Sequence, residues 1–227
     1  MLEIKDLQRK AGKFRLEHID FQVEEGYLVG ILGPNGAGKT TFFKALMEPK
    51  KGDKGSILWM GKDIRKNHVE FLGDTAYITE DMMFIEKLTA METAQMLGVF
   101  YEHYTDEAFE ACMEKVGVSK NITIAGMSRG QKIRFQLAFG MARKAKLYLM
   151  DEPTAGMDPA FRKEFYDLLR EILAEGATVL MSTHVQSDIN RNMDYVLTLK
   201  EGKQLRFQEN FGEAEEWSEV EICVEKD

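Results

Sequence analysis

The sequence has few cysteines and prolines and no long apolar segment. Its two cysteines, Cys112 and Cys223, are too few for a disulfide framework and favour a reducing compartment. No apolar run approaches the roughly 20 residues that cross a bilayer as a helix. The N-terminal segment MLEIKDLQRK lacks the apolar stretch of a signal peptide. We therefore expect a cytoplasmic protein, and a role in a membrane would need a separate membrane-spanning partner.

Acidic residues outnumber basic ones, 38 to 30. The formal net charge is −8, and most of it lies in residues 209–227, which hold eight acidic residues and one lysine. The lack of a basic surface argues against a nucleic-acid partner. Within this acidic tail, Val220, Ile222 and Val224 alternate with glutamates, which is the spacing of a strand. Both a solvated extension and a packed edge strand agree with the sequence.

Two kinds of strand are predicted around one globular core, for which a hydrophobic fraction of 44% is ample. Short apolar runs predict buried parallel strands at residues 27–32, 76–78, 147–150, 178–181 and 195–199. A separate antiparallel sheet is predicted at residues 1–6, 14–23 and 55–59. Gly202 predicts a hairpin before residues 204–207.

Helices are predicted in the remaining segments. Residues 159–174 place their apolar side chains on one helical face. Residues 81–145 contain no convincing strand and predict three helices, near residues 90–100, 105–116 and 128–142. The fold class is therefore α/β, a mostly parallel sheet flanked by helices, with an antiparallel β subdomain and an inserted helical subdomain. Residues 1–80 and 146–208 form the core of this single domain, 81–145 the insertion and 209–227 the tail.

A glycine-rich loop follows the first parallel strand and precedes a helix predicted at residues 40–47. Its spacing fits the phosphate loop of nucleotide-binding proteins, in the required strand–loop–helix context. Backbone N–H groups and the helix start would bind phosphate. The side chains of Lys39, Thr40 and Thr41 would contact the β- and γ-phosphates, Mg²⁺ and a further phosphate, respectively. A glycine-rich turn with an incidental lysine is the weaker alternative. The candidate residues are Gly33, Pro34, Asn35, Gly36, Ala37, Gly38, Lys39, Thr40 and Thr41.

Two acids end a second apolar strand. Asp151 and Glu152 follow residues 147–150, and ligands of open α/β sheets bind outside the carboxyl ends of the strands. We expect Asp151 near Mg²⁺, held directly or through water. Glu152 is the candidate general base that polarises the attacking water, a role worth on the order of 10²–10⁴ in rate. Capping of the next segment by both acids is the alternative.

A third motif, MSRGQ at Met127–Gln131, completes a resemblance to the nucleotide-binding subunit of ATP-binding cassette (ABC) transporters. The resemblance covers about residues 2–207. It implies a head-to-tail dimer, in which Ser128, Gly130 and Gln131 of one subunit meet the γ-phosphate held by the other. Ser128 can cap the helix that begins here, so that its positive end faces the anion.

The resemblance assigns two further residues. His184, which follows the strand at residues 178–181, would donate a hydrogen bond to the γ-phosphate; without this context a solvent-facing histidine would be the simpler interpretation. Asp158 would link the paired sites, and it can also cap the helix that begins at Pro159.

Three positions depart from the family pattern. Glu80 stands where the family usually has glutamine, and its carboxylate could still approach Mg²⁺. Arg129 replaces a glycine, and its side chain either adds a cation near the partner's nucleotide or points to solvent. The ring that usually stacks on adenine is not evident: Ala11 lies near the expected position, and Phe14 is the nearest aromatic residue.

The function implied by the resemblance is Mg²⁺-dependent hydrolysis of ATP in a transporter subunit. Its partners would be a polytopic membrane permease and a second ATPase subunit, identical or similar. The protein would be peripheral on the inner face of the cell membrane. Residues 81–85 and 99–104 flank the groove where family members receive a helix of the permease; the alternative is that they are core residues of the helical subdomain. Residues 182–196 are similar to exporter subunits. A soluble ABC ATPase without a membrane partner and a degenerate regulatory module are the alternatives.

Overall fold

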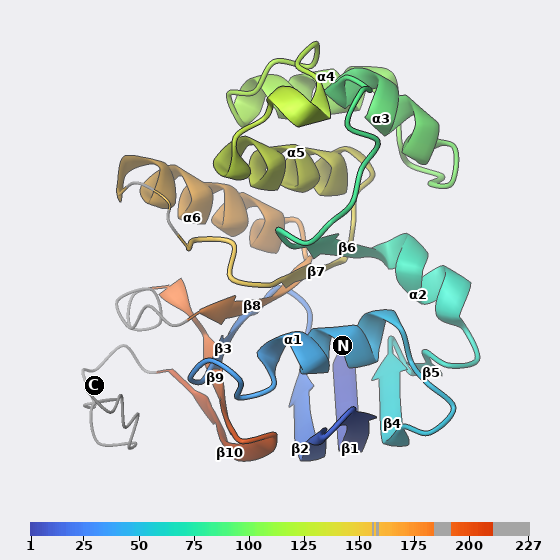
Figure 1. Ribbon diagram of the computed structural model, residues 1–227, viewed down its shortest axis with the longest axis vertical. Helices are drawn as coiled ribbons and strands as arrows, with labels where there is room; N and C mark the ends of the chain where they lie inside the picture. The colour runs from blue at the N-terminus through green and yellow to red at the C-terminus, as the bar shows by residue number, and fades with distance from the viewer. Residues whose placement is uncertain (156, 158, 184–191, 211–227) are drawn as a thin grey trace. The chain divides into compact units, whose positions relative to one another are not determined.

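The computed structural model describes residues 1–155, 157, 159–183 and 192–210 (Figure 1). Two compact units divide the chain: residues 1–66 together with the chain from Leu180 onward form the first, and residues 67–179 form the second. The predicted mixture of parallel strands, antiparallel strands and helices is confirmed. The predicted helical segment 81–145 lies wholly within the second unit, and its standing as a separate subdomain stays a prediction.

A mixed sheet runs through the first unit. Neighbouring strands follow the order β5 (Lys62–Asp63), β4 (Lys54–Trp59), β1 (Leu2–Ala11), β2 (Phe14–Val23), β10 (Lys203–Glu209), β9 (Tyr195–Lys200) and β3 (Leu28–Leu32). The strand β8 (Thr178–Thr183) begins in the second unit and ends in the first. β1 pairs antiparallel with β2 and β4, which confirms the predicted antiparallel layer. β3 pairs parallel with β9, as predicted. The predicted hairpin at Gly202 joins β9 to β10.

β3 and the helix after it form the buried centre of this unit. All five residues of β3 are buried, as its apolar run predicts. α1 (Lys39–Met47) buries Phe42, Phe43 and Leu46. Burying side chains of this size stabilises a fold by about 1.5–3 kcal/mol each. The strand and the helix that flank the phosphate loop are therefore firmly held.

A buried arginine fixes the far end of α1. Nη1 of Arg9 donates to the carbonyl oxygens of Lys44 and Glu48, at 2.6 and 3.0 Å. The same nitrogen lies 3.6 Å from a carboxylate oxygen of Asp53, and both side chains are almost fully buried. Removing one partner of a buried ion pair typically costs about 3–5 kcal/mol. The C-terminal end of α1 is therefore anchored to β1.

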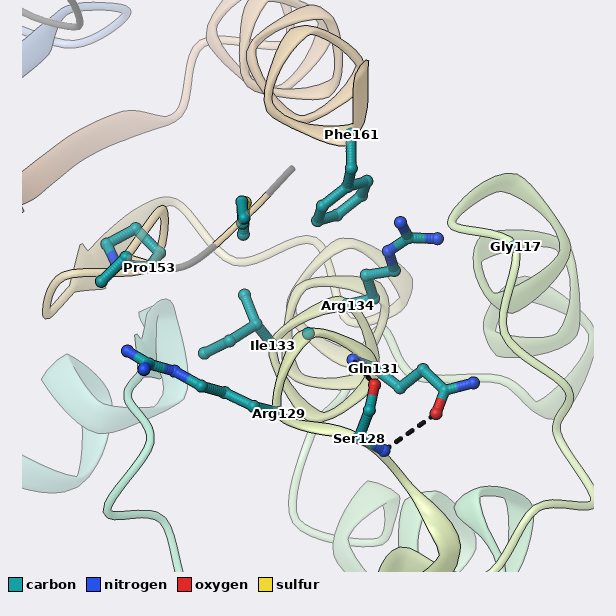
Figure 2. A pocket seen from close by; sticks show the side chains of 11 residues that line it. Gly117, Ser128, Arg129, Gln131, Ile133, Arg134, Pro153 and Phe161 are labelled. Atoms are coloured by element: carbon teal, nitrogen blue, oxygen red, sulfur yellow. Dashed lines mark hydrogen bonds between the residues drawn. The ribbon is translucent and has the colours of Figure 1, made fainter. Parts of the chain in front are cut away.

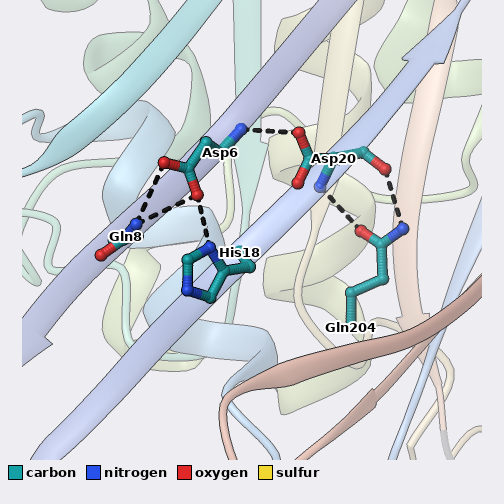
Figure 3. A network of polar contacts seen from close by, with 5 residues as sticks. All are labelled: Asp6, Gln8, His18, Asp20 and Gln204. Carbon is teal, nitrogen blue, oxygen red and sulfur yellow. Dashed lines mark hydrogen bonds and ion pairs between the residues drawn. The ribbon is translucent and has the colours of Figure 1, made fainter.

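Two bulges shape the hairpin of β1 and β2. The register between the strands shifts after Ile4 and shifts back after Leu7. Asp6 and His18 have left-handed backbone angles, with φ of 48° and 53°. An extra residue on each strand accounts for both shifts. Figure 3 shows that the two bulged residues meet, because Nδ1 of His18 lies 2.6 Å from the carboxylate of Asp6.

Hydrogen bonds extend this contact across three strands (Figure 3). The Asp6 carboxylate accepts from Nε2 of Gln8 at 3.0 and 3.1 Å, and the Asp6 amide donates to the Asp20 carboxylate at 2.7 Å. Gln204 of β10 bonds to both the amide and the carbonyl oxygen of Asp20, at 2.8 Å each. The hydrogen bonds from Gln8 and His18 lower the pKa of Asp6 below its ordinary value.

Replacing Asp6 with asparagine should destabilise the fold in a pH-dependent way. Because the folded-state pKa is depressed, the carboxylate stabilises the fold above the ordinary aspartate pKa of about 3.9, and this contribution is lost as the pH falls through the folded-state pKa. The difference in free energy of unfolding between wild type and D6N, measured with urea, should be largest near about pH 6 and shrink toward about pH 3. A difference that stays constant with pH would contradict this role.

Helices dominate the second unit. Its elements are α2 (His68–Asp74), β6 (Thr75–Ile78), α3 (Ala90–Gly98), α4 (Asp106–Lys115), the 3₁₀ turn η1 (Ile124–Gly126), α5 (Arg129–Ala142), β7 (Leu147–Met150) and α6 (Pro159–Ala174). β6 and β7 pair parallel, from Thr75 opposite Leu147 to Ile78 opposite Met150. The three helices predicted between residues 81 and 145 are confirmed, and so is the helix at 159–174. α2 lies in a segment for which a helix was predicted without bounds.

Aromatic rings join α4 and α5, which lie beside α3 in Figure 1. The ring of Phe109 in α4 contacts Phe135 and Phe139 in α5, at 6.0 and 6.4 Å between centroids. A Cβ on Gly140 would lie 2.9 Å from the Tyr148 ring and 3.0 Å from Ala76. Glycine therefore lets α5 approach β6 and β7 closely. In the described part of the chain, no helix combines the length and hydropathy needed to cross a bilayer.

Candidate functional site

The loop between β3 and α1 has the backbone that its glycine pattern predicts. Gly36 and Gly38 have φ angles of 80° and 111°, which residues with side chains rarely adopt. A Cβ on Gly33 would overlap the carbonyl oxygen of Leu199 and lie 2.7 Å from the Cβ of Ala37. The loop thus passes too close to β9 for any residue other than glycine at position 33.

This loop leaves the positive end of α1 open to an anion. The helix begins after Gly38, which has no side chain to cap it, and its first turn contains no acid. Amide groups at such a helix start bind phosphate well. Lys39 is 6% exposed, and its Nζ donates to the carbonyl oxygens of Gly33 and Pro34, at 2.8 and 3.3 Å. The ammonium group therefore lies against the loop that it would complete around a phosphate.

The turn between β9 and β10 supports the loop from one side. The amide of Gly202 donates to the carbonyl oxygen of Ala37 at 3.0 Å. A Cβ on Gly202 would overlap the carbonyl oxygen of Arg15, so this position also requires glycine. The ring of Phe14 is half-buried and lies against Gly38 and Gly202. Phe14 is thus next to the phosphate loop, and its stacking on adenine stays a prediction.

The two acids after β7 lie on a sharp turn. The amide of Asp151 donates to the carbonyl oxygen of Ile78 at 2.9 Å, which extends the pairing with β6 by one residue. Glu152 then has a left-handed backbone, with φ of 48°. Such a conformation costs about 1–3 kcal/mol in a residue with a side chain, and it is concentrated at functional sites. Both acids are half-buried at the carboxyl end of the strand, where the sequence predicted them.

Ser128 caps α5 as predicted. Its Oγ accepts from the amide of Gln131 at 3.3 Å, and Oε1 of Gln131 accepts from the amide of Ser128 at 2.9 Å. Together these bonds form a capping box. A pocket of about 530 Å³ adjoins the cap (Figure 2). Its lining includes Arg129 and Arg134 and, among the residues that the structure describes, no aspartate or glutamate.

The two arginines of this pocket are held differently. The guanidinium carbon of Arg134 lies 3.4 Å from the centroid of the Phe161 ring, and Nη1 donates to the carbonyl oxygen of Val116 at 3.2 Å. In Figure 2, Arg129 extends away from Ser128, on the opposite side from Arg134. Its Nε forms an ion pair with the carboxylate of Glu80.

This ion pair was not predicted. The expected partners were solvent or the partner's nucleotide for Arg129, and Mg²⁺ for Glu80, whereas the structure pairs the two side chains. A signal was present: the resemblance implies an uncharged residue at both positions, and this sequence has an acid at one and a base at the other. What the sequence did not supply was the proximity of two residues that lie far apart along the chain.

Not every predicted site residue can be placed. Asp158, His184 and the acidic tail beyond residue 210, with its predicted strand, lie outside the described residues. The phosphate loop and Phe14 belong to the first unit. Thr40 and Thr41 are half-buried in the first turn of α1. The second unit carries Glu80, Ser128, Gly130, Gln131, Asp151 and Glu152.

The predicted oxygen ligands suit Mg²⁺ that is bound partly by a nucleotide. They do not suit a metal ion that is bound by protein side chains alone. In the described ranges no group of three or more His, Cys, Asp or Glu side chains could hold a metal ion. Mg²⁺ commonly binds one or two carboxylates together with substrate phosphates and water. The Thr40 hydroxyl and the carboxylates of Asp151 and Glu80 are ligands of this kind.

A glycine loop at a helix start, acids at a strand end and a capped second helix define a nucleotide-binding protein of the phosphate-loop class. Residues 16–155 match the family model described as ABC transporter. The chain is 32% identical over 209 residues to the SkfA peptide export ATP-binding protein SkfE of Bacillus subtilis, covering 89% of this chain and 87% of that protein.

Two further relatives are also ATP-binding proteins of transport systems. Identity is 32% over 213 residues to the bacitracin transport ATP-binding protein BcrA of Bacillus licheniformis, covering 90% of this chain and 68% of that protein. Identity is 29% over 236 residues to the lantibiotic transport ATP-binding protein SrtF of Streptococcus pyogenes, covering 100% and 99%. The chain belongs to the ABC transporter family, and it is an ATP-binding subunit of that class and an ATPase.

Solved structures confirm the predicted fold. The ATP-binding subunit of an ABC transporter aligns with a TM-score of 0.82 at 25% identity, covering 92% of this chain and 90% of that chain. A dimeric ATP-binding cassette in a post-hydrolysis state with ADP and phosphate aligns with a TM-score of 0.80 at 20% identity, covering 92% and 98%.

Replacing Gly33 with alanine should both destabilise the protein and weaken nucleotide binding. The added methyl group meets the β9 backbone, and overpacking of this kind typically costs about 1–3 kcal/mol. Affinity for ATP, measured by fluorescence titration, should fall at least about tenfold, because the loop must shift. Gly52→Ala is the matched control, since a Cβ there meets nothing within 4 Å. Equal affinity in G33A and G52A would contradict the close approach to β9.

Proposed function

We propose that this protein hydrolyses ATP in a Mg²⁺-dependent reaction and couples it to export through a separate membrane permease, at the inner face of the cell membrane. The observation that carries the proposal is the phosphate loop, whose glycines, buried Lys39 and uncapped helix start suit a triphosphate. Export is supported by the relatives, which act in peptide export, bacitracin transport and lantibiotic transport.

Each predicted residue has a role in this proposal. The loop from Gly33 to Thr41 binds the phosphates, and Phe14 stacks on the base. Thr40 and Asp151 would supply the Mg²⁺ ligands from the protein. A third ligand at Glu80 stays a prediction, because its carboxylate is paired with Arg129 in this structure. Lys39 and His184 stabilise charge on the γ-phosphate, and Glu152 takes the proton of the attacking water. The residues offered to the second nucleotide are Ser128, Gly130, Gln131 and Asp158.

Catalysis of this kind is mostly positioning and charge stabilisation. Bound Mg²⁺ would neutralise charge that develops on the phosphates. Lys39 brings a fixed ammonium group, and the N–H groups at the start of α1 bring dipoles that need no reorganisation during the reaction. The left-handed turn at Glu152 holds its carboxylate on a short, constrained segment instead of a long loop. The attacking water would lose its proton to that carboxylate as its oxygen bonds to the γ-phosphorus, while the bond from that phosphorus to the β–γ bridging oxygen breaks and ADP leaves.

We further propose that two copies, or one copy with a similar subunit, bind ATP between them. The start of α5 supports this. Its N-terminal end carries a serine cap, a pocket without acidic lining among its described residues, and the arginines 129 and 134. A helix start of this kind favours an anion. The anion would be the γ-phosphate held by the other copy, in agreement with the dimeric cassette of the same fold.

The permease would bind exposed apolar residues on either side of α3 in the second unit: Met83 and Ile85 before the helix, and Val99 and Phe100 after it. Their side chains are 92%, 52%, 78% and 78% exposed. Other residues of the two predicted docking segments are part of the core instead. Phe84 packs edge-on against Phe135, and Tyr101 and Tyr104 pack against Phe139. The exposed apolar residues available for docking are therefore fewer than the two predicted segments contain.

Replacing Glu152 with glutamine should preserve ATP binding and slow hydrolysis. The substitution keeps the size of the side chain and removes the carboxylate that accepts the proton. Phosphate release should fall roughly 10²–10⁴-fold, while ATP affinity in a fluorescence titration stays unchanged. Glu175→Gln, at an exposed acid after α6, is the control and should keep full activity. Turnover by E152Q close to that of the control would remove Glu152 from this role.

Replacing Phe100 with glutamate should detach the protein from its permease. A charge buried in an apolar contact is left without a partner, and hot-spot losses of this kind reach about 2 kcal/mol or more. Tagged protein purified from membranes should bring down a polytopic membrane protein, and F100E should recover at least about tenfold less. Val69→Glu, on exposed α2, is the matched control. Recovery of only soluble partners would instead support an ATPase without a membrane partner.

A further inference from the structure

The ion pair between Glu80 and Arg129 joins two departures from the family pattern, and both residues belong to the second unit. Glu80 follows β6, at the start of the long segment that leads to α3. Arg129 is the first residue of α5, next to the serine cap. The pair therefore links the β6 end to the helix start that is proposed to face a second nucleotide. We call this ion pair the latch.

A buried contact keeps the two ends of the latch within reach of each other. Gln136 lies two turns along α5 from Arg129, and it bonds in both directions to the backbone of Thr79. Its Nε2 donates to the carbonyl oxygen at 3.0 Å, and its Oε1 accepts from the amide at 3.1 Å. Gln136 is 7% exposed and Thr79 is 6% exposed. Because buried bonds are costly to leave unmade, the backbone before Glu80 stays attached to α5.

The latch itself is exposed and can open. The side chains of Arg129 and Glu80 are 53% and 37% exposed. Water screens such pairs, and many contribute little to stability. A guanidinium group also binds phosphate through two parallel hydrogen bonds, which makes phosphate a strong competitor for Arg129. Arg129 also lines the pocket at the start of α5. Among the described residues that line this pocket, none has a carboxylate that could pair with Arg129.

We propose that the latch is closed in a single copy and opens when two copies pair around ATP. On opening, Arg129 turns from Glu80 to the phosphates of the nucleotide held by the other copy. Arg129 is then a side chain of the shared site, and Glu80 is an internal competitor that weakens pairing. This inference rests on the proposed function, because it requires the paired copies.

The latch makes opposite predictions for its two residues. In the Glu152→Gln background, the dissociation constant of the Mg-ATP dimer is measured by sedimentation. Glu80→Gln should lower it about 3- to 25-fold, since each dimer opens two latches and each exposed pair contributes at most about fivefold. Arg129→Gln should raise it at least about tenfold, because the phosphate contact is lost. The double variant should match R129Q, because no latch is left to release.

A second measurement needs no nucleotide. Hydrogen exchange of the nucleotide-free protein should be faster at residues 80–85 in both E80Q and R129Q, because either substitution opens the latch. Asp167→Asn and Arg170→Gln are matched controls on α6, where these residues form an exposed ion pair at 2.5 Å. Both controls should leave the dimer and the exchange of residues 80–85 unchanged.

Other results would overturn the inference in distinguishable ways. Equal weakening of the dimer by E80Q and R129Q would mean that the ion pair stabilises the dimer and does not open. No change with either variant would mean that the ion pair has no effect on pairing. Both outcomes reject the latch and leave the proposed paired site standing. Failure of the E152Q parent to dimerise with Mg-ATP would reject the paired site, and the latch with it.

Discussion

The proposed nucleotide site depends on the backbone of the phosphate loop, whose amide groups must not be blocked by side chains. A phosphate loop binds through its amide groups, so its shape must come from packing around it. Here the packing is supplied by β9 and by the turn after it, because Gly33 lies against the carbonyl of Leu199 and the amide of Gly202 bonds to Ala37. The antiparallel layer contributes at the other end, where Arg9 holds the last turn of α1.

α5 has a comparable position in the second unit. Along this one helix, Ser128 closes the N-terminal cap, Arg129 meets Glu80, Gln136 bonds to the backbone before Glu80, and Gly140 admits the β7 ring of Tyr148. The buried contacts fix the helix on the parallel strands, while the exposed one lies at the end offered to a partner. A rigid helix with a single exchangeable contact at its tip is suited to report on the occupancy of a shared site.

The parts of the fold and site that the sequence predicted correctly are those where neighbouring residues all favour the same structure. The apolar run of β3, the glycines after it and the Ser128 cap each favour one structure on short-range grounds. The failures have a different origin. α2 is only seven residues long, too short for a clear period that would mark its bounds. The bulges at Asp6 and His18 depend on strand register, and the Glu80–Arg129 pair depends on tertiary proximity, neither of which one sequence reveals. Phe84 and Tyr104 proved to pack inward, because an apolar segment does not show which of its faces is covered.

The most direct test of a site shared between copies is complementation. Lys39→Ala inactivates the loop of a copy, and Ser128→Arg blocks its α5 start, so each variant alone should be inactive. In a mixed dimer one site combines the intact loop with the intact helix. Mixing the two variants should therefore restore about a quarter of wild-type hydrolysis, since half of the dimers are mixed and each has one intact site. Full activity of the Ser128→Arg variant alone, or no recovery on mixing folded variants, would contradict the account.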